Sequence, residues 1–135
     1  MIHARIRTDG GSRGNPGRSG IGVVVEDADS GEVIEQHAKF LGITTNNQAE
    51  YQAVILGLAR CQALGAQTVE VLADSESLIK QARGEYKFKN PALRKRYMEL
   101  KRLEITFHRV TYKHVRREFN KAADALANQA MDEGE

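Results

Sequence analysis

Apolar and polar positions alternate in the first of three strand-like stretches near the start of the chain. In this stretch, Ile2, Ala4 and Ile6 fall on one face, and the residues between them fall on the other. This period of two is typical of a half-buried β-strand. The three predicted strands are residues 2–8, 21–27 and 32–42. Residues 27–31 have turn chemistry, which predicts antiparallel pairing of the second and third strands.

After residue 44 the apolar positions recur with the spacing of a helix. They predict a helix from Gln48 to about Leu64 with one apolar face. Asn46 or Asn47 can cap its start, because a short polar side chain can accept a hydrogen bond from a free backbone N–H group. Gly65 is placed to end it.

The rest of the chain alternates between predicted strands and helices. In order, they are a strand at 68–74, a short helix capped by Ser75, a helix starting at Pro91, a strand at 105–115 and a helix capped by Asn120. The element order βββαβααβα predicts an α/β fold with a mixed sheet.

The composition predicts one ordinary globular domain over residues 1–135, with 41% hydrophobic and 28% charged residues. The single cysteine, Cys61, excludes an internal disulfide and fits a reducing cytosol. It lies in an apolar helical stretch, which favours packing over a role as nucleophile. With no leader and no membrane-length apolar run, we expect a cytoplasmic monomer without membrane contact.

Charge alone does not indicate a partner, because the net charge is only +2. Basic residues do gather between residues 80 and 102 and again between 113 and 121. A solvated helix face is the better interpretation of either cluster taken alone.

Two aspartates occupy equivalent positions in the predicted elements. Asp9 stands where the first strand gives way to a Gly-rich loop, and Asp74 ends the fourth strand just before a helix. Hairpin chemistry alone would explain Asp9 equally well. If the two strands are parallel neighbours, however, both carboxylates lie at the same edge of the sheet, where open α/β sheets carry their sites.

Glu50 and Asp124 can join them, since each is expected in the first turns of a helix that packs against the sheet. Converging carboxylates repel one another, and their pKa values rise unless a cation lies among them. Oxygen ligands favour Mg²⁺ or Mn²⁺ over zinc. Two such ions about 4 Å apart can hold both oxygens of an in-line phosphodiester displacement. Water on one ion would attack, and the other ion would stabilise the leaving 3′ oxygen.

Four blocks together resemble the signature of type 1 ribonuclease H. They are TDGGSRGNPG at 8–17, TNNQAE at 45–50, ADS at 73–75 and NKAADALA at 120–127. The resemblance covers essentially the whole chain. It implies a ribonuclease H-like fold, with three antiparallel strands followed by two parallel strands. It also implies cleavage of the RNA strand of RNA–DNA hybrids, leaving 5′-phosphate and 3′-hydroxyl ends.

The resemblance further implies the site residues. It places Asp9, Glu50, Asp74 and Asp124 in a catalytic site for two Mg²⁺ ions when substrate is bound, with Mn²⁺ as a substitute. Further positions would contact the hybrid: Gly10, Gly14, Asn15, Thr45, Asn46, Asn47, Glu76 and Asn120. Turn and cap chemistry also explains the glycines and asparagines. Glu76 departs from the Gln of many relatives.

His114 stands ten residues before Asp124, where many relatives carry a histidine that assists proton transfer and product release. Its surroundings resemble instead a branch of the family with a shorter loop, in which this place is the end of a strand. Both an auxiliary catalytic role and a structural role are therefore open for His114.

The chain also resembles the members that lack a basic protrusion. Tyr86, Lys87 and Lys89 stand in the loop that replaces it and can supply substrate contacts in its place. Two other classes remain open: a silent nucleic-acid-binding module on the same fold, and another metal nuclease such as a junction resolvase or a proofreading exonuclease. The four acids disfavour the first class, and the asparagine and glycine blocks disfavour the second.

We expect the double substitution Lys87→Gln/Lys89→Gln to weaken hybrid binding and to flatten its salt dependence. Each lost phosphate contact should lower the slope of log K against log salt by about 0.9. Titrations of labelled hybrid at several salt concentrations would measure both effects. Unchanged affinity together with an unchanged slope would remove these lysines from the interface.

Overall fold

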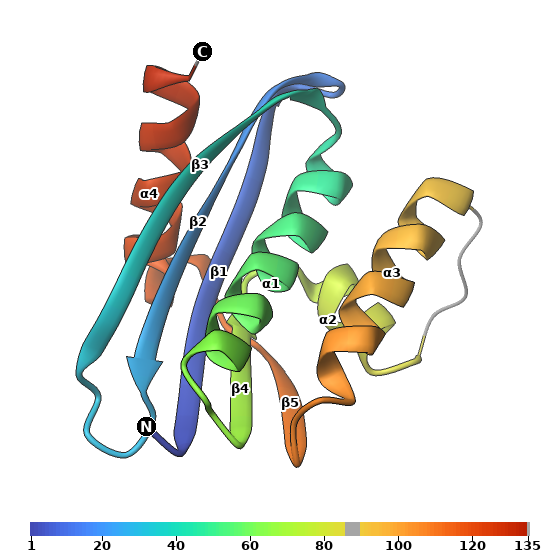
Figure 1. Ribbon diagram of the computed structural model, residues 1–135. Helices are drawn as coiled ribbons and strands as arrows, with labels where there is room; N and C mark the ends of the chain where they lie inside the picture. Colours follow the sequence, from blue (N-terminus) through green and yellow to red (C-terminus); the bar gives the residue numbers. More distant parts are fainter. Residues whose placement is uncertain (86–89, 135) are drawn as a thin grey trace.

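The computed structural model describes residues 1–85 and 90–134. Its elements, in chain order, are β1 (His3–Gly14), β2 (Gly17–Asp27), β3 (Val33–Thr44), α1 (Asn46–Ala63), β4 (Thr68–Ala73), α2 (Glu76–Ala82), α3 (Pro91–Glu104), β5 (Arg109–His114), a short 3-10 turn (Arg117–Phe119) and α4 (Lys121–Glu133). This order confirms the predicted βββαβααβα (Figure 1).

The five strands form one mixed sheet in the order β3-β2-β1-β4-β5. β2 pairs antiparallel with both β1 and β3, whereas β4 is parallel to both β1 and β5. The predicted fold class is therefore confirmed. Among the described residues, no helix is long and apolar enough to cross a membrane.

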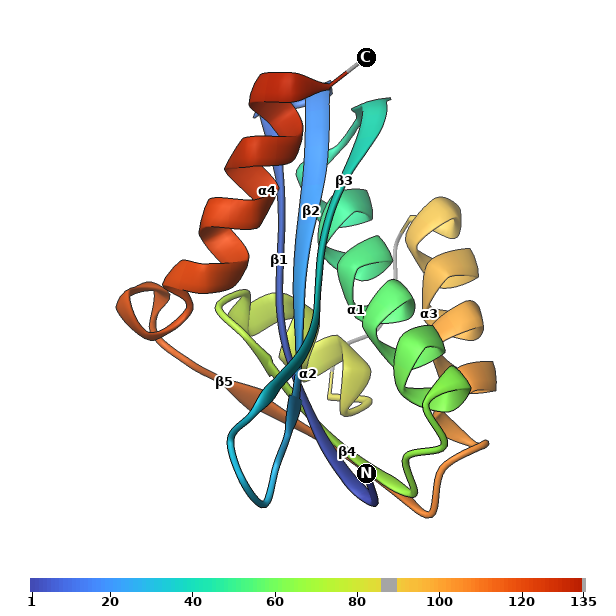
Figure 2. The ribbon, with the colours of Figure 1, turned by 60° about the vertical axis from the view of Figure 1, so that its left-hand side comes forward.

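Helices cover both faces of the sheet. α1, α2 and α3 lie on one face, and α4 lies on the other (Figure 2). The larger core is on the α1 side, where Ile6, Val23 and Val71 meet Leu58 and Leu100. Cys61 is buried in this core, as expected for a packing residue, and burial raises the pKa of its thiol to about 12.

The first hairpin is longer than its sequence predicted. We expected a Gly-rich loop between the strands at 2–8 and 21–27, but β1 continues to Gly14 and β2 begins at Gly17. Asp9 thus lies within β1, opposite Gly22, and is not at the end of the strand. It is nevertheless the first residue of β1 beyond the end of β4, because Thr8 pairs with Ala73, the last residue of β4.

Glycines in this hairpin serve helix packing as well as turn formation. A methyl group on Gly10 would overlap the backbone of Ala49 in α1, and one on Gly22 would overlap the backbone oxygen of Ala123 in α4. At these glycines, the backbones of the helices therefore pack directly against the backbones of the strands. Gly-rich sequence, which suggested a loop, is here a requirement of close packing.

Three other boundaries differ from the predictions. Thr45, and not Asn46 or Asn47, caps α1: its side chain accepts a hydrogen bond from the backbone N–H of Gln48. The last strand begins at Arg109 because residues 105–107 still turn back to the end of α3. Asn120 holds the N-cap position of α4, but its side chain makes no cap hydrogen bond.

The other predicted helix boundaries are confirmed. Gly65 ends α1 with a positive φ of 78°, Ser75 caps α2, and Pro91 begins α3 in its first turn.

We expect Gly22→Ala to lower the free energy of unfolding by about 1–3 kcal/mol, as for other overpacked cores. The added methyl group meets the α4 backbone, which cannot move aside without shifting the helix. Gly11→Ala is the matched control, since its methyl group would meet no backbone, but only the flexible end of Met131 at 3.4 Å and Asn46 Oδ1 at 4.0 Å. Urea unfolding would compare the two variants, and equal stabilities would contradict the proposed packing constraint.

Candidate active site

Four carboxylates from four elements line one cleft of about 380 Å³. Asp9 comes from β1, Asp74 follows the last residue of β4, and Asp124 lies in the first turn of α4. Glu50 is the fifth residue of α1, one turn later than predicted. The cleft therefore brings together the four acids that the sequence singled out.

Backbone contacts explain why these acids meet. Ala49 and Ala123, which contact Gly10 and Gly22, immediately precede Glu50 and Asp124. The two helices thus deliver their carboxylates to either side of β1, at the level of Asp9. Asp74 joins them because β4 is parallel to β1 and ends one residue before that level.

Asparagine side chains hold the surroundings of the acids. Asn46 Nδ2 donates to Glu50 Oε1 at 2.9 Å, which fixes the carboxylate along the start of α1. The backbone N–H of Asn46 donates to Asn15 Oδ1 at 3.1 Å. The hairpin tip is thereby joined to the beginning of α1, and the exposed side chain of Asn47 lies beside this junction.

Asn120 has a different role from the one predicted. We expected it to contact substrate, but it is only 1% exposed. Its Nδ2 donates to the backbone oxygen of Thr8 at 2.9 Å, directly before Asp9. Its Oδ1 is buried and has no hydrogen-bond partner within the described residues. Asn120 therefore positions the start of α4 against β1.

Burial and mutual repulsion make the cleft electrostatically unfavourable for free carboxylates. Burial raises the pKa of Asp9 to about 8, with further increases from the charge of Asp74 and from contact with Asp124. Burial also raises the pKa of Glu50, although hydrogen bonds from Ser75 and Asn46 oppose this shift. A cation among these groups would relieve both effects.

The donor set suits a hard divalent cation, because every acidic group in the cleft offers oxygen. Among the described residues, however, no three acidic, histidine or cysteine side chains are arranged closely enough to hold an ion as they stand. The chemistry of the donors therefore fits Mg²⁺ or Mn²⁺, and side-chain rotation would have to complete the coordination.

The cleft also contains cations that the sequence interpretation did not assign to it. Arg117 Nη2 lies 3.5 Å from Asp124 Oδ1, and the charge of Arg117 partly opposes the raised pKa of Asp9. Arg13 also lines the cleft and contacts Asp132 and Asn128 of α4. Helical spacing after Asp124 could have indicated Asn128, one turn further on, but no local signal marked Arg117 or Arg13.

Several predicted site residues lie outside the lining of this cleft. His114 ends β5 beside Ala73, is exposed, and lies near the carboxylate of Glu76. Glu76 itself pairs with Lys80 at 2.9 Å. Gly14 adopts a φ of 100° at the hairpin turn, so turn geometry explains it. Tyr86, Lys87 and Lys89 lie outside the described residues. The substrate roles of these residues stay predictions.

Comparison with known proteins supports a common origin for this arrangement. Residues 7–130 match the family described as reverse transcriptase-like. The bifunctional protein Rv2228c of Mycobacterium tuberculosis is 45% identical over 127 residues, which are 94% of this chain but 35% of that protein. The chain thus spans about a third of this relative.

Solved structures agree closely in shape. The N-terminal RNase H domain of Rv2228c superposes with a TM-score of 0.94 at 44% identity, covering 97% of this chain and 100% of that chain. RNase H1 of the archaeon Halobacterium salinarum gives a TM-score of 0.91 at 36% identity, with 98% of both chains covered. LC11-RNase H1, isolated from compost and crystallised with an RNA/DNA hybrid, gives 0.89 at 38% identity and 96% coverage of both chains.

A mixed sheet in this strand order, with an acidic cleft where β4 ends beside β1, defines the class as the ribonuclease H-like proteins. Within that class, the chain belongs to the ribonuclease H family, close to the short type 1 members of archaeal and metagenomic origin. The predicted family resemblance is therefore confirmed.

We expect Asp9→Asn to stabilise the metal-free protein increasingly as pH rises from about 4 to about 8. The folded-state pKa of Asp9, about 8, exceeds its ordinary value of 3.8. The folded state therefore keeps a proton that the unfolded state releases in this interval, and the stability of the unsubstituted protein falls there.

Thermal unfolding of both proteins in EDTA, across this pH range, would measure the difference in Tm. Added Mg²⁺ should reduce the difference at the alkaline end, because the ion compensates the repulsion. A Tm difference that stays constant with pH would show that Asp9 ionises normally in the folded protein.

Proposed function

We propose that this chain is an endonuclease that hydrolyses the RNA strand of RNA–DNA hybrids. The observation that carries the proposal is the convergence of Asp9, Glu50, Asp74 and Asp124 in one cleft. Support comes from relatives named ribonuclease H, one of them crystallised with an RNA/DNA hybrid. Because the chain spans about a third of the mycobacterial protein, the proposal concerns residues 1–135 alone.

The four carboxylates would hold two Mg²⁺ ions, or Mn²⁺ in their place, with the hybrid bound. Such ions lower the pKa of bound water and neutralise charge on the leaving oxygen. The protein's own contribution is to keep the ligands in place: Asn46 orients Glu50, and Asn120 fixes the strand backbone directly before Asp9. Displacement of the 3′ oxygen by water would leave 5′-phosphate and 3′-hydroxyl ends.

Hybrid selectivity would come from the surface formed by the hairpin tip and the start of α1. Asn15, Asn46 and Asn47 present amide groups there. Amides can bond 2′-hydroxyl groups and base edges in the wide minor groove of an A-like duplex. Thr45 accepts a hydrogen bond from Gln48 N, which leaves its hydroxyl hydrogen to donate to a phosphate of the DNA strand.

The test is cleavage of a labelled RNA–DNA hybrid with Mg²⁺, Mn²⁺ or EDTA. We expect metal-dependent cutting of the RNA strand only, and Asp9→Asn should reduce the rate by more than about a hundredfold. Groups that merely support metal ligands are already worth about 10–100-fold. Asp29→Asn, an equivalent change in the exposed turn before β3, should leave the rate unchanged.

Duplex DNA, duplex RNA and single strands serve as substrate controls. Hybrid binding without cutting would indicate a silent binding module and contradict the proposal. Cutting of the DNA controls would instead indicate another class of metal nuclease.

A further inference from the structure

On the α4 side of the sheet, no helix of the described residues covers β4 and β5. α4 packs against β1, β2 and β3, and Figure 2 shows it along the upper sheet, away from β5. On β5, the alternating residues Arg109, Thr111 and Lys113 are exposed. They belong to the open face, because Tyr112 and Val110 between them pack into the core on the other side.

Cations on this open face fall into two kinds. Arg5 and Arg7, on β1, are neutralised by Glu70 and Glu26 at 3.0 and 3.1 Å. Arg109 and Lys113, by contrast, have no carboxylate within ion-pair distance in the described part of the chain. The edge strand therefore carries the uncompensated positive charge of this face.

This charge lies directly beside the candidate active site. In the sheet register Lys113 pairs with Leu72, which pairs with Arg7. The next positions on that face are the acids Asp9 and Asp74, so Lys113 stands one row from the cleft. Arg109 lies four residues before Lys113 in β5 and therefore farther from the cleft. The rise of a strand places it about 13 Å from Lys113.

An exposed aromatic side chain adjoins the same row. Phe119 is 65% exposed, in the turn before α4. Arg7 Nη1 donates to its backbone oxygen at 3.3 Å, so this turn lies over the row that contains Lys113. Cations that follow a backbone, combined with an aromatic ring on which a base can stack, are typical of surfaces that bind single-stranded nucleic acid.

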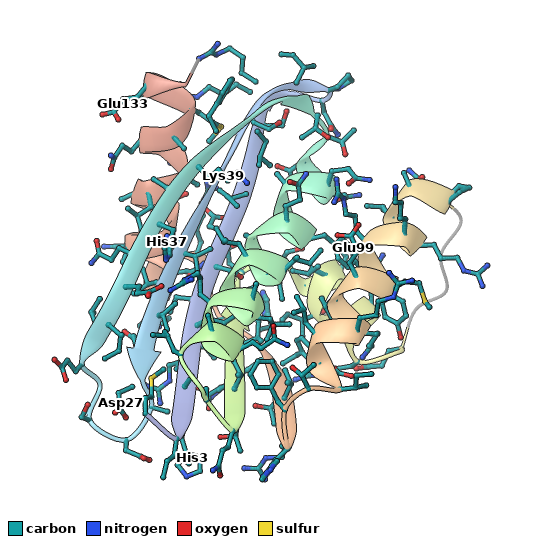
Figure 3. All side chains as sticks on the ribbon, viewed as in Figure 1. His3, Asp27, His37, Lys39, Glu99 and Glu133 are labelled. Carbon is teal, nitrogen blue, oxygen red and sulfur yellow. The ribbon has the colours of Figure 1, made fainter. Side chains whose placement is uncertain are left out.

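The far end of the face is hollowed. A shallow depression of about 250 Å³ is lined by polar groups that include His3, Thr68, Arg109 and Thr111. Figure 3 shows His3 at the end of the sheet farthest from α4's C-terminus. Phe119, Lys113 and Arg109 thus lie in succession on this face between the cleft and the depression, which Glu70, paired with Arg5, also lines.

We propose that Arg109, Lys113 and Phe119, here called the β5 strip, bind a single-stranded extension of the RNA whose hybrid segment occupies the cleft. This proposal rests on the proposed function, because it takes the RNA extension to continue from a hybrid that lies in the cleft. We infer the occupant from charge complementarity. The strip offers two uncompensated cations, and they lie in a line that the phosphate backbone of a single nucleic-acid strand can follow. The alternative is that β5 is charged only to prevent edge-to-edge pairing of sheets.

The test compares hybrids that differ only in their ends. Fluorescence anisotropy in EDTA, where no cutting occurs, would give affinities for a blunt hybrid and for hybrids with a single-stranded RNA tail at the 3′ or the 5′ end. We expect one RNA tail to tighten binding about tenfold, comparable to one base stack, and to steepen the salt dependence.

Arg109→Gln/Lys113→Gln should abolish the gain from the tail and leave affinity for the blunt hybrid unchanged. Phe119→Leu should reduce the gain, since the ring is lost and bulk is kept. The matched control is Lys39→Gln/Arg102→Gln, which removes two exposed charges elsewhere. Figure 3 shows Lys39 on β3, the opposite edge of the sheet.

The proposal is overturned if neither RNA tail tightens binding, if the gain survives Arg109→Gln/Lys113→Gln, or if the control variant loses it too. A gain from a DNA tail alone would also overturn it. Failure to bind the blunt hybrid would count against the proposed function instead. In that case, binding of single-stranded RNA would decide the role of the strip, because only Arg109→Gln/Lys113→Gln, and not the control variant, should weaken it.

Discussion

Contact between helix backbones and two strand glycines is the constraint on which the rest of this structure depends. Gly10 follows Asp9 in the chain, and Gly22 pairs with Asp9 across the hairpin. The helix residues that they meet, Ala49 and Ala123, directly precede Glu50 and Asp124. Any side chain at either glycine would push a helix away and withdraw its carboxylate. The same backbone contacts therefore pack the two helices against the sheet and bring the acids together.

Gathering the acids has an energetic cost that the fold must offset elsewhere. Asp9 is desolvated and lies among like charges, and next to it Asn120 leaves a buried oxygen without a partner in the described residues. Buried unsatisfied groups and repelling charges each destabilise a folded protein. The core between the sheet and α1, with fully buried residues such as Ile6 and Leu58, supplies the compensating apolar burial.

Sequence periodicity was sufficient for the order of elements, because strand and helix spacing are local properties, whereas the resemblance to type 1 ribonuclease H was needed to single out the four acids. Periodicity failed where tertiary contacts decide. The glycines at 10, 11 and 14 suggested a loop, although pairing with β2 makes all three part of β1 and Gly10 also packs against α1. Asn120 looked accessible as a helix cap, yet α4's approach to β1 buries it. Arg117 reaches the cleft only because the chain turns between β5 and α4, a path that no local pattern encodes.

The hydrogen bond from Asn46 N to Asn15 Oδ1 has a consequence for recognition. It joins the tip of the first hairpin to the first turn of α1, two segments 31 residues apart. A duplex that touches both would meet one rigid surface in place of two independent loops. The conformational entropy of ordering that surface is lost during folding and not during association, so less of the interaction energy is consumed when the ligand binds. Preorganisation of this kind favours a duplex whose groove width matches the fixed distance between the hairpin tip and the first turn of α1.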